Sequence, residues 1–540
     1  MPIYQFLLYD IHKAITFLLF DTLIAFCDEK VYNVHINQHG GICMKKILAL
    51  ILATLMILPL VASCNQPAGP TDETTPDDTP GETTPIVTDK YEPEVPDEKY
   101  DYEVRCLSAS NYWQNYDILG NTDDSPIVID TTLHNAITKR NDKMEAEYGV
   151  TFKNITDSNV YSKAYVALSM NRDLYDIILT GITNAGLLAQ KGYLIPAQEL
   201  EYLDLSRPYY DQRCLEELDI GGNNFFFFSD ITTVNLDAIW TFFFNHELIE
   251  YYSLENPYQL LSDYKWTLDK MIEMCSKATL DSDATPTVND NWGMVGHDYI
   301  ITSAYIGSGL RVATADDLGD ISLTMNSNMT KVEGIMNKMI DLQKYWCRYA
   351  LTSRSYPEYG TSDPYGFVPG DDFEELVSVF TSGNALFMAE VLSTLRKLED
   401  YEMTVGLLPT PLYDESQTEY YSAVNHSGTA TCIPTTTTDT GRISAIIEAW
   451  ACESHYTLLP AYYEQCMQSR YAKDTVTPEA LDMIFASRSY DLGIYYSWGN
   501  LMNRFTALTY NGQTDFSSMY EKNRETAQSA LDTFVHYFGG

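Results

Sequence analysis

Between Val104 and Ala189 the sequence alternates strand-forming and helix-forming segments, and this alternation limits the possible folds more than any other feature. Apolar periodicity predicts strands over 104–108, 150–155 and 176–181, and helices over 133–148, 161–170 and up to Ala189. Gly149 directly follows the first helix, where it suits a C-terminal cap. Successive strand-helix-strand units predict an α/β fold with a largely parallel sheet and helices on both of its faces.

Two loops of this region lie where such sheets bind ligands. In open α/β sheets, ligands bind beyond the carboxyl ends of the strands. The segment after the first strand contains Tyr112 and Trp113, and the third strand ends at Thr180 and Gly181. We expect these residues at a ligand site.

The rest of the chain mixes further strands and helices. Strand-forming residues gather at 225–228 and 240–245, and further strands are predicted at 384–388, at 403–407 and as a pair within 420–433. Thr267 and Asn245 are expected to cap the helices that follow them. Other helices are predicted over 328–348, 371–381, 443–452, 478–489 and 517–537.

The segment 44–64 has the parts of a secretory signal. Met44 is followed by two lysines and by an apolar stretch of about 15 residues, which is shorter than the roughly 20 residues that span a bilayer. The stretch ends in Val61-Ala62-Ser63-Cys64, which resembles a bacterial lipobox. We therefore expect Cys64 to carry a lipid anchor after removal of 44–63, and we interpret 1–43 as an upstream extension.

Residues 64–100 are rich in Pro, Thr and acidic side chains and contain few apolar residues. Such a segment cannot bury enough surface to fold, so it is expected to be an extended, disordered tether. The folded body is then expected to span 101–540.

The charge balance excludes one class of partner. The 540 residues include 34 Lys and Arg against 75 Asp and Glu, a formal net charge of −41. Because nucleic-acid affinity comes largely from basic side chains, we expect no nucleic-acid partner. The 41 tyrosines suit uncharged polar ligands, although Tyr also fills protein cores.

The cysteines of the body show no CxxC spacing, which argues against a zinc ribbon or a disulfide framework. We expect buried free thiols, with one oxidised pair left as an alternative, among Cys106, Cys214, Cys275, Cys347, Cys432, Cys452 and Cys466.

Several segments, in order along the chain, resemble stretches of the extracellular solute-binding proteins of ABC importers, of the carbohydrate-binding type. They are Leu174–Ile178 with 187–190 and Gly192–Pro196; Phe244–Leu248 with Asn256–Tyr258; Lys265–Asp269; Phe380–Phe387; and Leu408–Pro411 with Tyr413–Glu415 and Gln417.

The resemblance implies a two-lobed periplasmic-binding-protein-like fold with a hinge and an interlobe cleft. Lobe one is expected to span about 101–237 and 421–460, and lobe two about 238–420 and 461–540. It also implies a monomer at the extracellular face of the cell membrane, anchored by its lipid. Such a protein captures a solute, here expected to be a sugar or oligosaccharide, and delivers it to the subunits of an ABC permease.

Sugar recognition uses aromatic faces, with carboxylates and amides fixing the hydroxyls, so the candidates are residues of these types on strand-end or lobe-edge loops. For each single candidate, a structural role is the alternative. The expected ligand-binding residues are Tyr112, Trp113, Thr180, Gly181, Trp240, Trp292, Glu390 and Trp498.

Enzyme motifs are missing from the sequence. His246-Glu247 lacks the second His of HExxH, and neither a GxSxG elbow nor a phosphate-binding glycine motif occurs. We expect no catalytic residue, cofactor or metal. Two alternatives stay open, namely a lipid-anchored, glycan-binding surface adhesin without transport and a glycoside hydrolase, because no motif marks the two carboxylates that hydrolysis needs.

Overall fold

The computed structural model describes residues 91–540 except 111–116, 122–128, 130, 281–286, 317–318, 360–372, 399–400, 469–477, 539–540 and the side chains of 373 and 465–468. The predicted lipid-bearing Cys64 and the ligand candidates Tyr112 and Trp113 lie outside the described residues. The chain divides into two units, Met1–Glu82 and Thr83–Gly540, and all described residues belong to the second.

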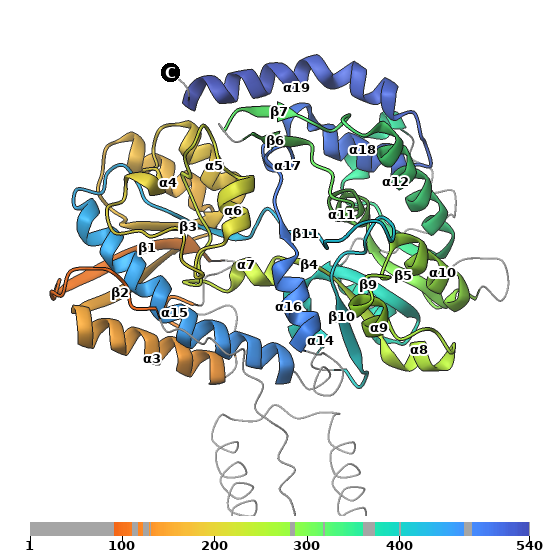
Figure 1. Ribbon diagram of the computed structural model, residues 1–540, viewed down its shortest axis with the longest axis horizontal. Coiled ribbons are helices and arrows are strands. Elements are labelled where there is room, and N and C mark those ends of the chain that lie inside the picture. Colours follow the sequence, from red (N-terminus) through yellow and green to blue (C-terminus); the bar gives the residue numbers. More distant parts are fainter. Residues whose placement is uncertain are drawn as a thin grey trace, which may run out of the picture. The chain divides into compact units, whose positions relative to one another are not determined.

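A sheet with the strand order β12-β3-β1-β2 forms the centre of lobe one (Figure 1). Its strands are β1 (Tyr102–Ala109), β2 (Val150–Asp157), β3 (Ile177–Gly181) and β12 (Thr429–Cys432). β1 pairs in parallel with β2 and with β3, which confirms the predicted parallel pairing, and β12 pairs antiparallel with β3. The last strand therefore comes from a distant part of the chain.

Helices cover both faces of this sheet because β1, β3 and β12 bury side chains on both sides. Val104 and Cys106 of β1 pack in one core with α3 (Thr131–Tyr148) and α15 (Thr440–Gln468). Leu107 of the same strand packs in a second core with α4 (Val160–Ser169) and α5 (Ile182–Gln190). Figure 1 shows the two helix pairs on opposite sides of the sheet.

A second sheet, of order β10-β4-β9-β5-β8, forms the centre of lobe two. β9 and β5 are parallel, as are β5 and β8, whereas β4 runs antiparallel to β9 and to β10. Every residue of β4, β5, β9 and β10 is buried. The strands are β4 (Trp240–Asn245), β5 (Trp292–His297), β8 (Trp346–Tyr349), β9 (Ala385–Val391) and β10 (Val405–Leu408).

Short elements and helices complete the fold. Asn245 and Thr267 cap α8 and α10 through their side chains, as predicted. The remaining helices are α6 (Gln212–Glu217), α7 (Val234–Asp237), α8 (His246–Tyr251), α9 (Pro257–Ser262), α10 (Leu268–Ala278), α11 (Tyr299–Gly307), α12 (Met329–Leu342), α13 (Phe373–Thr381), α14 (Leu395–Leu398), α16 (Pro478–Ala486), α17 (Leu492–Tyr495), α18 (Leu501–Tyr510) and α19 (Phe516–Phe538). The short strands are β6 (Ala313–Ala315), β7 (Ile321–Leu323), β11 (Ser422–Ala423) and β13 (Arg488–Ser489).

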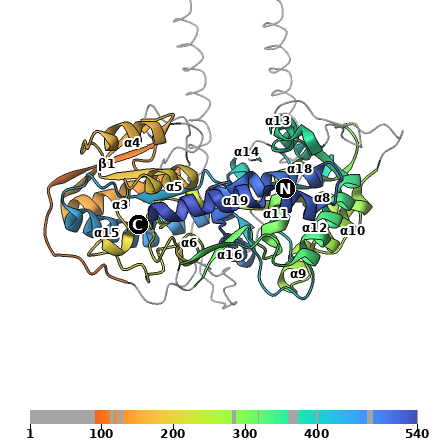
Figure 2. The ribbon, with the colours of Figure 1, turned by 90° about the horizontal axis from the view of Figure 1, so that it is seen from above.

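Besides the chain segments that pass from one lobe to the other, helix packing and an ion pair also join the two lobes. Helix α19 contacts both α18 and α5, and Figure 2 shows it running along the two lobes. Arg311, which precedes β6, forms an ion pair of 2.7 Å with Glu217 of α6. These contacts join segments that lie far apart in the sequence.

The predicted helix over 328–348 is wrong in its last turn and a half. α12 ends at Leu342, a 3₁₀ turn covers Gln343–Tyr345, and β8 begins at Trp346. Trp346 and Tyr349 favour strands, and pairing with β5 buries this segment at the edge of the second sheet. The tertiary partner therefore overrides the helical periodicity.

Two predicted strand regions are also corrected. Residues 225–228 form no regular strand; Phe227 makes one bridge to Thr431, and its aromatic neighbours are buried within a loop. Within 420–433 the two short strands do not pair with each other, because β11 pairs with β13 and β12 with β3. Partners distant in sequence decide both outcomes.

The prediction of buried free thiols is confirmed for the cysteines whose side chains the structure describes. They are Cys106, Cys214, Cys275, Cys347, Cys432 and Cys452.

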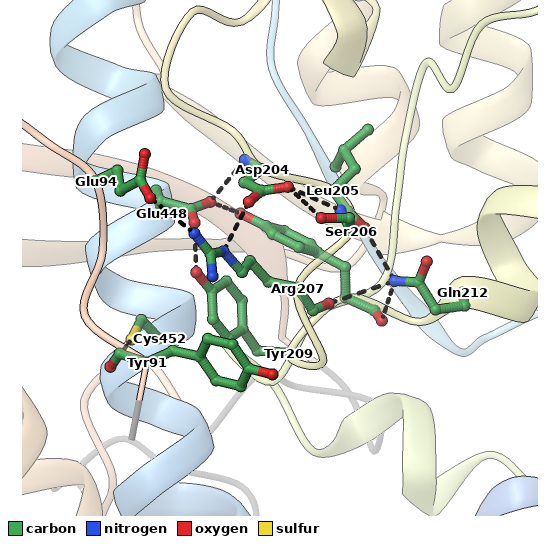
Figure 3. A network of polar contacts seen from close by, with 11 residues as sticks. Tyr91, Glu94, Asp204, Leu205, Ser206, Arg207, Tyr209, Gln212, Glu448 and Cys452 are labelled. Atoms are coloured by element: carbon green, nitrogen blue, oxygen red, sulfur yellow. Dashed lines mark hydrogen bonds and ion pairs between the residues drawn. The ribbon is translucent and has the colours of Figure 1, made fainter. Parts of the chain in front are cut away.

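The described residues begin at Tyr91, and residues 91–100, which composition assigns to the tether, lie on lobe one. We call these residues the strap. The backbone N–H of Tyr91 donates to the Tyr456 hydroxyl of α15 (2.6 Å), and that of Tyr100 donates to the Tyr148 carbonyl of α3 (2.8 Å). Arg207 forms an ion pair of 3.1 Å with Glu94, and Figure 3 shows this guanidinium between Glu94 and Asp204.

Candidate functional site

The strand ends of lobe two meet at one edge of its sheet. β9 and β5 end at Val391 and His297, and β8 ends at Tyr349, which lies opposite His297 in the register. β4 runs the other way, so its first residue, Trp240, lies opposite Val391. Four strands therefore bring their side chains to the same edge.

Lobe one presents an equivalent edge. β3 ends at Gly181 and continues directly into α5, and β12 begins opposite it at Thr429. The loop that precedes β12 carries Asn425 and His426. Both edges are thus formed by the strand ends at which open α/β sheets bind ligands.

A cavity of about 730 Å³ lies where the two edges meet. We call it the aromatic cavity. Lobe two lines it with Trp240, His297, Tyr299, Tyr349 and Glu390, and lobe one with Thr183, Asn425 and His426. Its volume is within the range of about 300–1,000 Å³ that is usual for small-molecule sites.

Aromatic rings gather on one wall of this cavity. The rings of Trp240 and Tyr299 are stacked, with centroids 4.4 Å apart and an angle of 20° between the planes. His297 meets Trp240 edge-on at 5.0 Å. Tyr495 lines the cavity from α17, and its hydroxyl donates to the Val424 carbonyl. The wall is therefore formed by side chains from four separate elements, β4, β5, α11 and α17.

A buried ion pair lies beside these rings. Nε2 of His297 is 3.0 Å from Oε1 of Glu390, and both side chains are 10% exposed or less. Nδ1 of His297 accepts a hydrogen bond from the Tyr299 backbone N–H, so the neutral ring carries its proton on Nε2. Burial opposes the charged ring most strongly, but the contact with Glu390 and the charge of Asp298 outweigh it and raise the pKa of His297 above 6.5.

Two buried polar atoms of the cavity wall lack a hydrogen-bond partner among the described residues. They are Nε1 of Trp240 and Oε1 of Glu390, whose contact with His297 is an ion pair without hydrogen-bond alignment. Native proteins leave few buried polar groups unpaired, and each one costs free energy. The indole donor of Trp240 therefore remains unsatisfied in the wall of the cavity, whereas Oε1 of Glu390 has the His297 ring as its polar neighbour.

The charged groups of the cavity are paired. Lys397 Nζ lies 2.5 Å from Glu374, and Glu390 is paired with His297. Glu390 is the single carboxylate in the described lining. The cavity therefore offers a charged solute no unpaired counter-charge among its described residues.

A smaller cavity, of about 380 Å³, adjoins the first on lobe one. We call it the polar cavity. Its lining includes Thr180, Gly181, Asn184 and Ser427, and it shares Thr183 and His426 with the aromatic cavity. It lies at the carboxyl ends of β1 and β3.

The structure brings together four of the residues expected from the sequence. Trp240 and Glu390 line the aromatic cavity, and Thr180 and Gly181 line the polar cavity. Trp292 and Trp498 line neither. Trp292 is the first residue of β5, at the end of the strand that lies away from the cavity. Its Nε1–H donates to the Thr287 carbonyl.

Trp498 is 3% exposed and stacks on Tyr496 at 5.7 Å. It lies under α19, where its ring also meets Phe534 edge-on at 5.2 Å. These contacts give Trp498 a packing role between α19 and the segment before α18.

Sequence reasoning missed His297, Tyr299 and His426. His297 ends β5 and Tyr299 lies just beyond it; this strand was not predicted because it follows an Asp- and Asn-rich loop. A buried apolar run ending in His-Asp-Tyr was the available signal. His426 lies in a loop whose place is set by the pairing of β12 with β3.

The described part of the chain holds no group of three or more His, Cys, Asp or Glu residues that could bind a metal ion. Among the helices that the structure describes, none combines the length and the apolar character needed to cross a membrane.

Comparisons identify the fold. No family model matches the chain, and no curated protein matches it. A sugar transporter from Rhizobium etli, solved in an open conformation, superposes with a TM-score of 0.52 at 11% identity over 79% of this chain and 99% of that chain. This likeness shows that the chain has the predicted two-lobed periplasmic-binding-protein-like fold.

Two further solved structures superpose over a similar share of the chain. The maltose/maltodextrin-binding domain MalE from Bdellovibrio bacteriovorus, bound to maltotriose, has a TM-score of 0.49 at 13% identity and covers 80% of this chain and 100% of that chain. The sugar-binding protein MalE from Xanthomonas citri has a TM-score of 0.49 at 12% identity and covers 81% of this chain and 98% of that chain.

Proposed function

We propose that this chain is an extracellular solute-binding protein that captures a sugar or oligosaccharide and delivers it to an ABC importer. The observation that carries the proposal is the aromatic cavity between the strand ends of the two lobes. It combines a volume of about 730 Å³ with stacked rings and with the unpaired indole donor of Trp240 in its wall. A solute hydroxyl that accepted a hydrogen bond from Trp240 Nε1 would recover the free energy that this group loses by burial.

The chemistry of the cavity favours an uncharged solute. A polyamine would need unpaired carboxylates, and an acidic solute would need unpaired cations, because burying an unpaired charge costs several kcal/mol. The charges of the described lining are already paired. Aromatic rings beside polar groups suit the apolar faces and hydroxyls of sugars, and we extend to this chain the sugar specificity of the Rhizobium etli transporter.

We propose further that Cys64 carries a lipid that holds the protein at the outer face of the cell membrane. The apolar segment 47–61 and the lipobox-like 61–64 support this anchor. The tether would then let the two lobes reach the solute as a monomer and dock on the permease subunits.

A glycoside hydrolase is the enzyme alternative. Hydrolysis of a glycosidic bond ordinarily uses a pair of carboxylates, about 5–10 Å apart, on either side of that bond. Glu390 is the single carboxylate in the described lining of the aromatic cavity, and it is paired with His297. We therefore propose that the chain binds its solute without hydrolysing it.

Thermal unfolding in the presence of candidate solutes tests the proposal. The full chain, with Cys64→Ser to prevent lipidation, is heated with neutral mono- and oligosaccharides, with peptides and with polyamines. A solute present at a hundred times its Kd stabilises the native state by about 2.7 kcal/mol, so its class is recognised by a raised Tm. Reducing-end assays on the same sugars detect hydrolysis.

A rise in Tm with a neutral sugar and no new reducing ends is the expected result. A rise with polyamines or peptides alone would show that the solute class is wrong. No response to any soluble compound, together with binding to polymeric glycans or cells, would support the adhesin alternative.

A further inference from the structure

The polar cavity is continuous in its lining with the aromatic cavity. Thr183, in the first turn of α5, and His426, in the loop before β12, line both. A solute that fills the aromatic cavity therefore meets these two residues at its lobe-one end. Beyond them lies a further volume of about 380 Å³.

The two cavities differ in chemistry. The aromatic cavity has ring faces and a buried ion pair. The described lining of the polar cavity holds no carboxylate, ammonium or guanidinium group and no Phe, Trp or Tyr. Its side-chain polar groups are hydroxyls and amides, for example those of Thr180, Asn184 and Ser427, beside the imidazole of His426.

Regular secondary structure fixes the walls of the polar cavity. Gly181 pairs with Thr429 in the register of β3 and β12, and a Cβ added at Gly181 would lie only 2.7 Å from the His426 carbonyl oxygen. The absence of a side chain at Gly181 thus lets the His426 loop close against β3. Asn184 Nδ2 makes a long contact of 3.4 Å with Thr180 Oγ1, which leaves this amide able to bond a ligand.

We propose that the polar cavity is a second subsite, which holds a further uncharged, hydroxyl-rich unit of the solute whose first unit occupies the aromatic cavity. The proposal rests on the proposed function. The solute is then an oligomer of at least two units. Its first unit presents an apolar face to Trp240 and Tyr299, and its next unit is bound through hydrogen bonds alone.

If the polar cavity is a second subsite, the affinity for a sugar increases with its number of units. A monosaccharide fills the aromatic cavity alone, whereas a di- or trisaccharide also gains the hydrogen bonds of the polar cavity. Each net hydrogen bond contributes about 1 kcal/mol, which corresponds to roughly a fivefold gain in affinity. A charged second unit finds no counter-charge and gains nothing.

Calorimetric titration of the full chain with Cys64→Ser tests this inference. The probes are glucose, maltose and maltotriose, then the matching xylose and mannose series, and a maltotriose oxidised to the uronate at one end. Two variants alter the polar cavity: Asn184→Ala removes an amide, and Ser158→Trp fills the volume from an exposed position. Gln190→Ala, on the same helix but outside the lining of both cavities, is the matched control.

The expected result is an affinity for the trisaccharide at least tenfold above that for the monosaccharide of the same series. Both cavity variants should lower the ratio of trisaccharide to monosaccharide affinity about fivefold or more, whereas Gln190→Ala should leave this ratio unchanged. The uronate should bind no better than the monosaccharide. Equal affinities for one, two and three units, or a ratio that both variants leave unchanged, would overturn the second subsite alone. No binding by any sugar would overturn the proposed function, and the subsite with it.

Discussion

Trp240 and Trp266 are both buried in lobe two, but their indole N–H groups differ in their partners. Nε1 of Trp266 donates to the Pro409 carbonyl at 2.9 Å, whereas Nε1 of Trp240 has no partner among the described residues. A buried donor without a partner lowers stability, and such costs are tolerated where a ligand satisfies the group. Because Trp240 also lines the aromatic cavity, we propose that its free indole donor serves ligand binding.

Replacing each Trp by Phe separates these roles. Trp240→Phe removes an unsatisfied donor, so we expect an unchanged or slightly higher free energy of unfolding and an affinity for sugar lowered about fivefold or more. Trp266→Phe removes a satisfied donor, so we expect a loss of about 1–3 kcal/mol in stability and an unchanged affinity. Urea unfolding and calorimetric titration measure the two quantities. Equal losses of stability in both variants would contradict this assignment.

The ion pair of His297 with Glu390 should make stability depend on pH. Because its partners raise the pKa of His297 above 6.5, the pair's contribution is fully present below that pH and is lost as the pH rises through the raised pKa. The difference in free energy of unfolding between the wild type and Glu390→Gln should therefore be larger at about pH 6 than at about pH 9. Urea unfolding at the two pH values measures this difference.

Glu358→Gln is the matched control for this pH effect. Glu358 pairs with Arg504 at 2.9 Å, and an arginine does not titrate in this range. Loss of the Glu358 carboxylate should therefore change the free energy of unfolding by the same small amount at both pH values. A difference for Glu390→Gln that is equally independent of pH would show that His297 does not change its charge in the folded protein.

At the scale of elements, the junction of β3 with α5 carries the lobe-one part of the site. Gly181 ends the strand and occupies the N-cap position of α5. A Cβ there would meet the backbone of His426 at 2.7 Å and that of Ser427 at 3.3 Å, so the β12 loop would have to move.

Gly181→Ala should lower the free energy of unfolding by about 1–3 kcal/mol and weaken sugar binding, because the loop that lines both cavities is displaced. Gly441→Ala is the matched control, since the nearest atom to its added Cβ lies 3.8 Å away and the residue belongs to α15. There we expect unchanged or higher stability. Thermal unfolding and titration measure both effects, and a Gly181→Ala protein that behaves like Gly441→Ala would refute the close approach.

The same scale shows why some elements were predictable and others were not. α10 and α8 begin where Thr267 and Asn245 cap them, because a cap is a contact within three residues. β8 was predicted as the end of a helix, and its strand exists because Trp346–Tyr349 pair with β5, about fifty residues earlier in the sequence. Local signals therefore located helix starts, whereas the pairing of β8 with β5 left no signal in the sequence of β8 itself.

For the molecule as a whole, the strap adds residues 91–100 to the folded body. The strap contacts α15, α3 and Arg207, and none of these contacts involves a described residue that lines either cavity. A protein of residues 91–540 should therefore be more stable than one of residues 101–540, by about 1–3 kcal/mol, and should bind sugar with the same affinity.

Tyr456→Phe tests the strap within this comparison. Its hydroxyl accepts from the Tyr91 N–H at 2.6 Å, so its removal should cost about 1 kcal/mol in 91–540 and less in 101–540. Urea unfolding of the four proteins measures the coupling. Equal costs in both lengths, or a weaker sugar affinity in 101–540, would contradict the separation of the strap from the binding site.

The sequence by itself determined those properties that depend on neighbouring residues or on composition. The alternation from Val104 to Ala189 predicted the parallel strands of lobe one. Short motifs in order resembled solute-binding proteins, whose two-lobed fold the chain has. These signals can be recognised in the sequence alone because helix caps, periodicity and charge do not depend on residues far away in the chain.

Only the tertiary structure decided which residues share a cavity. Trp240, His297 and Glu390 come from three strands that lie about fifty or more residues apart, and the sheet register alone places them at one edge. Trp498 is of a residue type that often contacts sugars, yet Phe534 of α19 packs against its ring. The physical reason is that a binding site requires side chains to converge in space, and that convergence is set by strand order and packing rather than by any local pattern.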